Sequence, residues 1–204
     1  MHMATYRETL RVIQPIITPT FRALRVGLEG TASLHEREGL GRTRDPWFYA
    51  HAARRKAADE LKECGLLVES PRGGRPLHAM SGLLVRFKTV AIRIYRTSLT
   101  PSGQVIVPIP GRSRRKQRFW RQEQDPTLDG MEQDNLLLLW RDDAGTLVDP
   151  LTLVRPIGGS HRRDSLQLDW RGPLSEHMAS LRAADLDGLR PTIEYPRLGD
   201  EGAG

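Results

Sequence analysis

The strongest strand pattern in this sequence lies between residues 82 and 96, where β-branched and aromatic side chains alternate with charged ones. Val85 and Phe87 hold one phase of the alternation, and after Thr89 the phase reverses. Because a slip of one residue exchanges the two faces of a strand, one regular strand cannot contain that reversal. We therefore predict two strands that meet at a tight turn or a bulge. Each would bury one apolar face, and the opposite face would be basic and accessible, with Arg86, Lys88, Arg93 and Arg96.

The other apolar segments predict a mostly antiparallel sheet. Four consecutive leucines occupy positions 136–139, and such an unbroken run is typical of a strand covered on both faces. The turn residues at 142–145 predict a hairpin between that strand and the next apolar run. Besides the two central strands, we expect strands at residues 66–69, 102–111, 136–140, 151–154 and 166–170.

The N-terminal third of the chain predicts helices instead. A first helix at residues 6–14 is expected to end before Pro15, because the residue that precedes a proline is driven out of the helical region. Thr18 and Pro19 then supply an N-cap and a first helical position for a second helix. Two helices separated by prolines are therefore expected.

The clearest helix signal lies between residues 45 and 64. Asp45 is a favourable N-cap, Pro46 suits the first helical position, and Gly65 can adopt the left-handed conformation that ends a helix. Small and apolar residues recur every three or four positions, which indicates close packing against another element. These residues are Ala50, Ala53, Ala57, Leu61 and Cys64.

The order of this helix, a short strand, a turn and another strand also occurs in winged helix-turn-helix proteins. In that interpretation the helix, which carries Arg54 and Arg55, would enter the major groove of DNA. Arg72 and Arg75 in the turn would then contact phosphates. The same order is common in α+β domains, where such a helix packs on the sheet. We favour the packing helix and keep the DNA-binding helix as the alternative.

Together these elements predict a single α+β domain over residues 4–188. A helical part at 4–65 would pack on a mostly antiparallel sheet at 66–172, and a helix at 173–188 would close the fold. A chain of 204 residues is long enough to bury a core without disulfides or metals. Residues 189–204 have little apolar content and are expected to form a loose tail.

The charge of the chain is divided unevenly along its length. The net charge is +6 with a pI of about 10.0. Residues 1–125 contain 23 Lys and Arg against 11 Asp and Glu, a net of +12, whereas residues 126–204 contain 8 against 14, a net of −6. This asymmetry indicates a basic part that faces a polyanion. The alternative is an arginine-rich composition with solvated arginines, since only 4 of the 31 basic residues are lysine.

Residues 111–121 form the densest basic segment, with six cations around Phe119 and Trp120 and no acidic residue. Like charges this close repel one another unless an anion screens them. Aromatic rings between guanidinium groups can stack on bases while the charges follow the phosphates. The alternative is that the two aromatic residues anchor a solvated helix to the core. We favour the contact with nucleic acid or an acidic protein.

One internal echo is present in the sequence. "PIPGRSRR" at residues 108–115 and "PIGGSHRR" at residues 156–163 agree at five of eight positions, and each follows an apolar segment. Two such loops, with backbone donors at glycine and a pair of arginines, could form phosphate-binding concavities. Turns of this composition are also ordinary in proteins, and coincidence is the interpretation that we favour.

Candidate catalytic and metal-binding residues are few. With one cysteine, Cys64, the chain cannot form an intramolecular disulfide or a cysteine-based zinc site, and its histidines lack the spacing of a zinc-protease helix. We therefore predict no catalytic residue, metal or cofactor. A metal-dependent nuclease with a basic substrate groove is the alternative, because Asp142 and Asp143 follow a strand and could hold a cation. Aspartates in a hairpin turn also have a sufficient structural reason to be there.

The sequence lacks the signals of membrane or secreted proteins. No apolar run approaches the ~20 residues of a membrane-spanning helix, and the N-terminus has no secretory pattern. Together with the lone cysteine, this predicts a cytoplasmic protein that does not contact a membrane.

Four phrases of the sequence resemble those of a group of uncharacterised actinobacterial proteins. The phrases are "GLLVRFKTVAIRIYR", "VPIPGRSRRKQRFW", "NLLLLWRDDAGTLVDPLTLVRPIGG" and "LQLDW", and they cover roughly residues 80–171. Genes of that group tend to lie beside genes for helix-turn-helix proteins joined to ImmA/IrrE-type metallopeptidases. The resemblance implies a paired regulatory system, such as a toxin–antitoxin or phage-defence module, and assigns no functional residue.

From these observations we predict a non-enzymatic regulatory partner that contacts nucleic acid or an acidic protein surface through an arginine-rich face. A protein partner is expected, and nucleic acid is a further candidate. The residues expected to make these contacts are Arg54, Arg55, Arg86, Lys88, Arg93, Arg112, Arg114, Arg115, Lys116, Arg118, Trp120 and Arg121.

Overall fold

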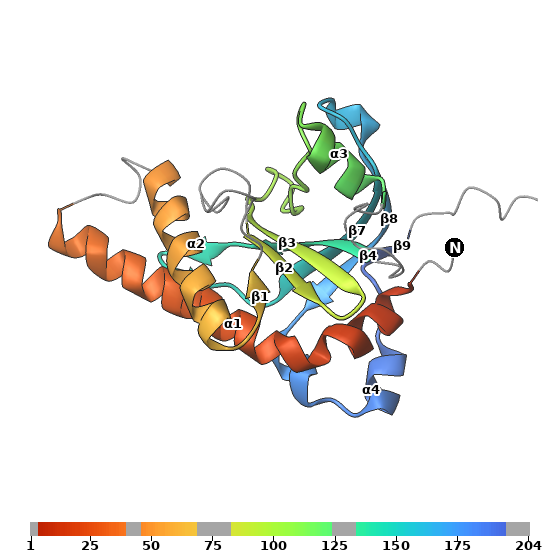
Figure 1. Ribbon diagram of the computed structural model, residues 1–204, viewed down its shortest axis with the longest axis horizontal. Helices are drawn as coiled ribbons and strands as arrows, with labels where there is room; N and C mark the ends of the chain where they lie inside the picture. The colour runs from red at the N-terminus through yellow and green to blue at the C-terminus, as the bar shows by residue number, and fades with distance from the viewer. Residues whose placement is uncertain (1–3, 40–45, 69–82, 124–133, 195–204) are drawn as a thin grey trace, which may run out of the picture.

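The protein has an α+β fold, as predicted, in which a mostly antiparallel sheet lies between two long helices and one short helix. The computed structural model describes residues 4–39, 46–68, 83–123 and 134–194. Helices α1 (Tyr6–Arg37) and α2 (Pro46–Glu63) cover one side of the sheet, and α3 (Arg114–Trp120) lies on the other (Figure 1). Within the described ranges, no helix has an apolar stretch of the length that crossing a bilayer requires.

The main sheet has seven strands in the order β1-β2-β3-β4-β7-β8-β9. Neighbouring strands are antiparallel, except that β3 and β4 are parallel. Two short strands, β5 and β6, form a separate hairpin between β4 and β7. The bounds are β1 Leu67–Val68, β2 Leu83–Phe87, β3 Val90–Arg96, β4 Asp134–Trp140, β5 Asp142–Asp143, β6 Thr146–Leu147, β7 Leu151–Gly158, β8 Gln167–Leu174 and β9 Ile193–Glu194.

The phase reversal in the central segment is a two-residue hairpin turn. Phe87 is the register partner of Val90, so Lys88 and Thr89 alone connect β2 and β3. Lys88 has a φ of 48°, a left-handed conformation that suits a short hairpin turn. The prediction of two strands joined by a tight turn is confirmed.

Both faces of the sheet are buried. On the helix side, Val90, Ile92 and Ile94 of β3 pack with apolar residues of α1 and α2. On the other side, Phe119 and Trp120 of α3 cover alternate residues of β3 and β4. The four leucines of β4 are divided between the two sides, which confirms the prediction of a strand covered on both faces.

The prediction that β2 and β3 present an accessible basic face is wrong. The segment between β3 and α3 crosses that face, where Val107 and Trp120 are buried. As a result Arg93 is only 4% exposed, and Arg86 is half-buried. Alternation in a strand indicates which residues share a face. Whether these residues are exposed to solvent depends on the segment that covers that face.

The N-terminal region is one helix instead of two. Pro15 and Pro19 lie inside α1, although each proline removes a helical hydrogen bond. A capping box of Thr5 and Glu8 starts the helix. Its buried stripe runs from Leu10 to beyond the second proline without interruption. Packing of this long apolar stripe on the sheet outweighs the two lost bonds, and the helix changes direction in its first half, where Figure 1 shows a bend.

Helix α2 agrees with its sequence signals within the described residues. Gly65 has a φ of 75°, the left-handed conformation expected after the helix end, while Asp45 lies outside the described residues. Ala53, Ala57 and Leu61 are buried against α1, which confirms the packing stripe. This stripe does not decide against the winged-helix alternative, which stays a prediction, because a recognition helix also packs one face on its own domain. Its expected wing contacts, Arg72 and Arg75, lie outside the described residues.

The two long helices lie very close together at Gly27. A Cβ atom at this position would lie 2.5 Å from the backbone oxygen of Ala53, whereas at Gly30 it would meet the flexible end of Lys56, 2.9 Å away. We expect Gly27→Ala to destabilise the protein by about 1–3 kcal/mol, because a backbone atom cannot move aside. Gly30→Ala is the matched control and should be neutral or stabilising by up to ~1 kcal/mol. Urea denaturation of both variants tests this, and equal midpoints would contradict the close approach.

Two further segments differ from their predictions, and one agrees. Residues 102–111 form no regular strand, only an isolated bridge between Leu99 and Val105, because prolines 108 and 110 cannot donate to a ladder. The expected strand at 166–170 is present as β8. The expected tail from residue 189 is also wrong in part, since β9 pairs with β8, and residues 195–204 lie outside the described ranges.

The expected C-terminal helix is present, but it is shorter than the predicted 173–188. β8 continues to Leu174, and then come the 3₁₀ turn η3 (Glu176–Ser180) and the helix α4 (Ala183–Gly188). Between the two, Gln14 of α1 donates hydrogen bonds to the carbonyl oxygens of Met178 and Leu181, at 3.1 and 2.7 Å. These carbonyls bond across the fold instead of along a continuous helix, which explains the interruption.

Candidate functional site

Helix α3 is anchored to the core by its aromatic residues. Ser113 is the N-cap, and its hydroxyl accepts a hydrogen bond from the backbone N–H of Lys116. Trp120 is 0% exposed, and its indole N–H donates to the carbonyl oxygen of Pro108 at 3.3 Å. The expectation that Trp120 contacts a ligand is therefore wrong, because its ring lies wholly inside the protein. The anchoring alternative describes what the structure shows.

The outer side of this region carries the basic residues. Arg118 and Arg121 interact with Glu123, with N–O distances of 3.0 and 3.8 Å. All of the arginines of the predicted basic segment are exposed. We call this set the α3 arginine surface; it consists of Arg112, Arg114, Arg115, Arg118 and Arg121.

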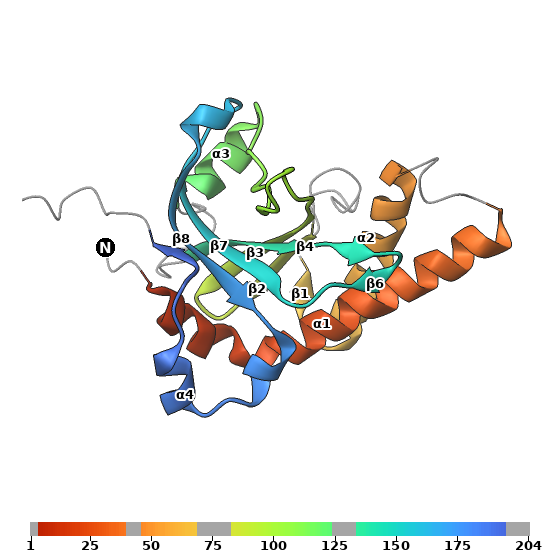
Figure 2. The same cartoon turned by 180° about the vertical axis from the view of Figure 1, so that it is seen from behind.

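The two echoing loops lie against each other, an arrangement that the sequence analysis did not predict. A Cβ atom at Gly159 would be 3.3 Å from Pro110 and 3.2 Å from the ring of Trp120. Arg163 also donates a hydrogen bond to the carbonyl oxygen of Val107. Figures 1 and 2 both show the turn η2 (Arg163–Ser165) beside α3. This neighbourhood adds exposed Arg162 to the basic side of the molecule, and the echo was its only signal in the sequence.

The remaining surface residues of the predicted set are not gathered on α3. Arg55 is exposed on α2 and pairs with Asp59 on the same helix, at 3.4 Å. Lys88 lies in the hairpin turn, with its ammonium group 5.4 Å from the centre of the Phe87 ring. That turn adjoins the start of β3, whereas α3 contacts β3 near its other end, where the Tyr95 ring lies beside the Trp120 ring. The predicted basic residues therefore do not form one continuous patch.

A second group of basic residues lies beneath α3, between three elements of the fold. It comprises Arg54 of α2, Arg93 of β3 and Lys116 of α3, together with Tyr95 of β3, and we call it the cationic cluster. The Arg93 guanidinium lies 4.7 Å from the centre of the Phe119 ring. The Nε atom of Arg93 and the hydroxyl of Tyr95 are buried, and neither has a hydrogen bond of normal geometry to any described residue.

The pKa shifts in the cationic cluster have burial as their main cause. Burial raises the pKa of Tyr95, and the positive charge of Arg93, a hydrogen bond from Arg93 and the positive charge of Arg54 oppose that rise. Burial lowers the pKa of Arg54, which Tyr95 opposes. Burial also lowers the pKa of Lys116, and repulsion from Arg93 and Arg54 lowers it further. The cluster is thus a partly desolvated region of positive charge.

The acidic residue proposed as a nuclease ligand has a structural role. The Asp142 carboxylate accepts hydrogen bonds from Arg96 at 2.9 Å, from the Tyr49 hydroxyl at 3.3 Å and from the Gly145 N–H at 3.2 Å. Asp143 is exposed in the β5–β6 hairpin. In the part of the chain that the structure describes, no group of three or more His, Cys, Asp or Glu residues could hold a metal ion. This geometry does not favour the nuclease alternative.

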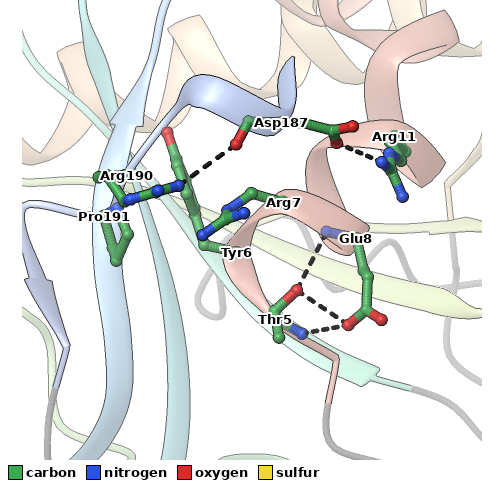
Figure 3. A pocket seen from close by; sticks show the side chains of 8 residues that line it. All are labelled: Thr5, Tyr6, Arg7, Glu8, Arg11, Asp187, Arg190 and Pro191. Carbon is green, nitrogen blue, oxygen red and sulfur yellow. Dashed lines mark hydrogen bonds and ion pairs between the residues drawn. The ribbon is translucent and has the colours of Figure 1, made fainter. Parts of the chain in front are cut away.

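A polar groove of about 440 Å³ lies between the start of α1 and the segment after α4 (Figure 3). Arg11 pairs there with Asp187, and Arg190 donates to the Asp187 carbonyl oxygen at 3.2 Å. Tyr6 donates to the Pro173 carbonyl oxygen, and burial raises the pKa of its hydroxyl to about 12. The residues that line the groove, including Thr5, come from the N-terminal and C-terminal parts of the chain. We therefore interpret the polar contacts in the groove as interactions that hold these two parts together.

Comparison with known proteins adds no relative to this picture. No family model matches the chain, and neither a curated protein nor a solved structure is significantly similar to it.

Proposed function

We propose that this protein is a non-enzymatic regulatory protein that binds the phosphate backbone of nucleic acid through the α3 arginine surface. The observation that carries the proposal is the two-sided character of α3. Its aromatic residues are fixed in the core, and its arginines are exposed around them. A rigid element that displays several guanidinium groups suits contact with phosphates, which arginine can bind through two hydrogen bonds.

The proposed contact is electrostatic and independent of base sequence. Phe119 and Trp120 are buried and do not offer rings for base stacking. Guanidinium contacts with phosphates supply affinity and position but carry little sequence information. Exposed Arg162, in the turn beside α3, extends the same surface.

The regulatory part of the proposal rests on the resemblance described above. A toxin–antitoxin or phage-defence module in the cytoplasm would supply a protein partner, and an acidic surface on that partner could meet the same arginines. Co-expression with the products of the neighbouring genes tests this part. Co-purification that is lost when Arg114 and Arg115 are replaced would favour the protein over nucleic acid as the occupant.

The nucleic-acid contact is tested by removing charge from α3 and measuring the salt dependence of binding. For Arg114→Gln/Arg115→Gln, the slope of log affinity against log salt on duplex DNA should become shallower by about two, since each phosphate contact contributes ~0.9. Fluorescence anisotropy with duplex and single-stranded oligonucleotides at several KCl concentrations measures this slope.

The matched control removes the same charge from other parts of the surface. Arg37 and Arg182 are exposed at the end of α1 and just before α4. Arg37→Gln/Arg182→Gln should leave the slope within experimental error of the wild type. A wild-type slope in the α3 variant, or an equal decrease in both variants, would refute α3 as the contact surface.

A further inference from the structure

We propose that the cationic cluster of Arg54, Arg93 and Lys116 is a binding site for a single phosphate group, with the Tyr95 hydroxyl as an additional donor. This site lies beneath α3 and is distinct from the α3 arginine surface. It does not depend on the proposed nucleic-acid contact.

The environment of Arg93 is the first observation that favours an anion as ligand. Its side chain is buried among apolar residues, with Leu84 and Leu137 as its register partners on the neighbouring strands. Among the residues that the structure describes, it forms no ion pair with a carboxylate, and the face of Phe119 is its close neighbour. A buried arginine without a counter-ion is costly, so proteins normally pair such a group.

A second deeply buried arginine among the described residues shows the usual arrangement. Arg155 is 2% exposed and binds Asp134 at 2.8 Å and Asp169 at 3.1 Å. The two arginines are buried to a similar degree, yet only Arg155 receives carboxylates from the described residues. Within the described residues, the fold thus neutralises one buried guanidinium with carboxylates and leaves the other without a carboxylate and with an Nε donor that meets no acceptor.

Lys116 and Tyr95 are the second, independent observation. Lys116 is half-buried on α3 and forms no ion pair with a described residue. The Tyr95 hydroxyl is buried, and Arg93 is the one described side chain that interacts with it as a hydrogen-bond donor, so its O–H remains available to an acceptor. These donors approach Arg93 from a helix and from its own strand, and Arg54 adds a charge from α2. Arg93 and Lys116 come from different elements, and their positive charges repel one another unless an anion lies between them.

The chemistry of these donors favours a phosphate group. A guanidinium can bind two phosphate oxygens at once, and an ammonium and a phenol can each donate to the remaining oxygens. A phosphate carries up to two negative charges, so it balances the charges of Arg93 and Lys116 better than a carboxylate does. The group could belong to a free small phosphate compound or to the phosphorylated end of a nucleic-acid strand.

Inorganic phosphate is the probe that tests the site. Thermal unfolding is followed while KCl is replaced by potassium phosphate at constant ionic strength and pH. Phosphate should raise the midpoint of the wild type in a saturable way, because a ligand that binds only the folded state stabilises it. Lys116→Gln should bind phosphate about tenfold more weakly, the usual effect of losing one charged hydrogen bond.

Two further variants separate this site from the exposed surface and from simple loss of fold. Arg114→Gln removes a nearby exposed charge and should keep the full phosphate response. Arg93→Met removes the buried charge, and the variant should be at least as stable as the wild type in phosphate-free buffer but should not respond to phosphate. If Arg93 only stabilised the fold, Arg93→Met would instead be less stable than the wild type in phosphate-free buffer.

The source of the phosphate is distinguished with oligonucleotides. If the ligand is the end of a nucleic-acid strand, a 5′-phosphorylated oligonucleotide should bind more tightly than its 5′-hydroxyl form. Lys116→Gln should then remove this difference. Equal binding of the two forms, with phosphate stabilisation retained, indicates a small phosphate compound. The proposal is overturned if phosphate stabilises the wild type no more than chloride, or stabilises the wild type and Lys116→Gln equally. Neither result depends on Arg114→Gln/Arg115→Gln, which tests the nucleic-acid surface separately.

Discussion

Trp120→Ala is expected to lower the free energy of unfolding by ~3–5 kcal/mol, the usual cost of removing a large buried aromatic side chain. The Trp120 ring is fully buried between Phe119 and Tyr95, with ring centres 5.8 and 6.0 Å away. It also contacts the backbone at Gly159, where a Cβ atom would lie 3.2 Å from the indole. Urea denaturation of the variant and the wild type measures the difference.

The neighbouring residue provides the control for this variant. Arg121 is exposed one position after Trp120, so Arg121→Ala should change the stability by less than ~0.5 kcal/mol. A Trp120→Ala protein as stable as Arg121→Ala, but weaker in binding DNA, would restore the sequence-based interpretation in which the ring contacts a ligand. Similar loss of binding in both variants, without loss of stability, would also argue against the anchor.

Arg155→Met is expected to destabilise the protein by ~3–5 kcal/mol, because it removes the cation that binds the buried carboxylate of Asp169 and the half-buried carboxylate of Asp134. The Arg155 guanidinium donates to Asp134 from Nε at 3.0 Å and from Nη2 at 2.8 Å, and to Asp169 from Nη1 at 3.1 Å. Asp169 is 1% exposed, so water cannot replace the lost hydrogen bonds without opening the sheet. Chemical denaturation measures the change in free energy.

Removing the carboxylates together with the arginine tests the cause. The triple variant Arg155→Met/Asp134→Asn/Asp169→Asn should recover much of the lost stability, since uncompensated charge rather than lost volume dominates the cost. An Arg155→Met protein within ~0.5 kcal/mol of the wild type would show that the three charges contribute little. The contrast with Arg93→Met, which is expected not to destabilise, separates a neutralised arginine from one without a counter-ion.

Several features could be predicted because they depend on short-range patterns. The reversal of alternation at Lys88 and Thr89 has one simple solution, a tight turn, since a strand cannot change its faces by itself. The stripe of Ala53, Ala57 and Leu61 required a closely packed neighbour, and α1 is that neighbour. In both cases the local period and the steric limits of the backbone leave few alternatives.

The basic residues could not be sorted in the same way. Arg93, Arg114 and Arg155 are the same residue type in the sequence, yet the first is buried without a carboxylate partner among the described residues, the second is exposed and the third lies between two carboxylates. Whether each arginine is exposed to solvent depends on the segments that pack over its face of the sheet. Those contacts join residues far apart in the chain, so no local pattern records them.

The sequence by itself determined the α+β class, the two central strands and the packed helix after residue 45, because side-chain periodicity acts over a few residues and selects the faces to be buried. Only the tertiary structure decided that α1 continues through Pro15 and Pro19, that Trp120 is an anchor, and that positive charge divides into an outer surface and an inner cluster. These outcomes depend on the free energy of packing and desolvation summed over distant segments, which overrides local preference.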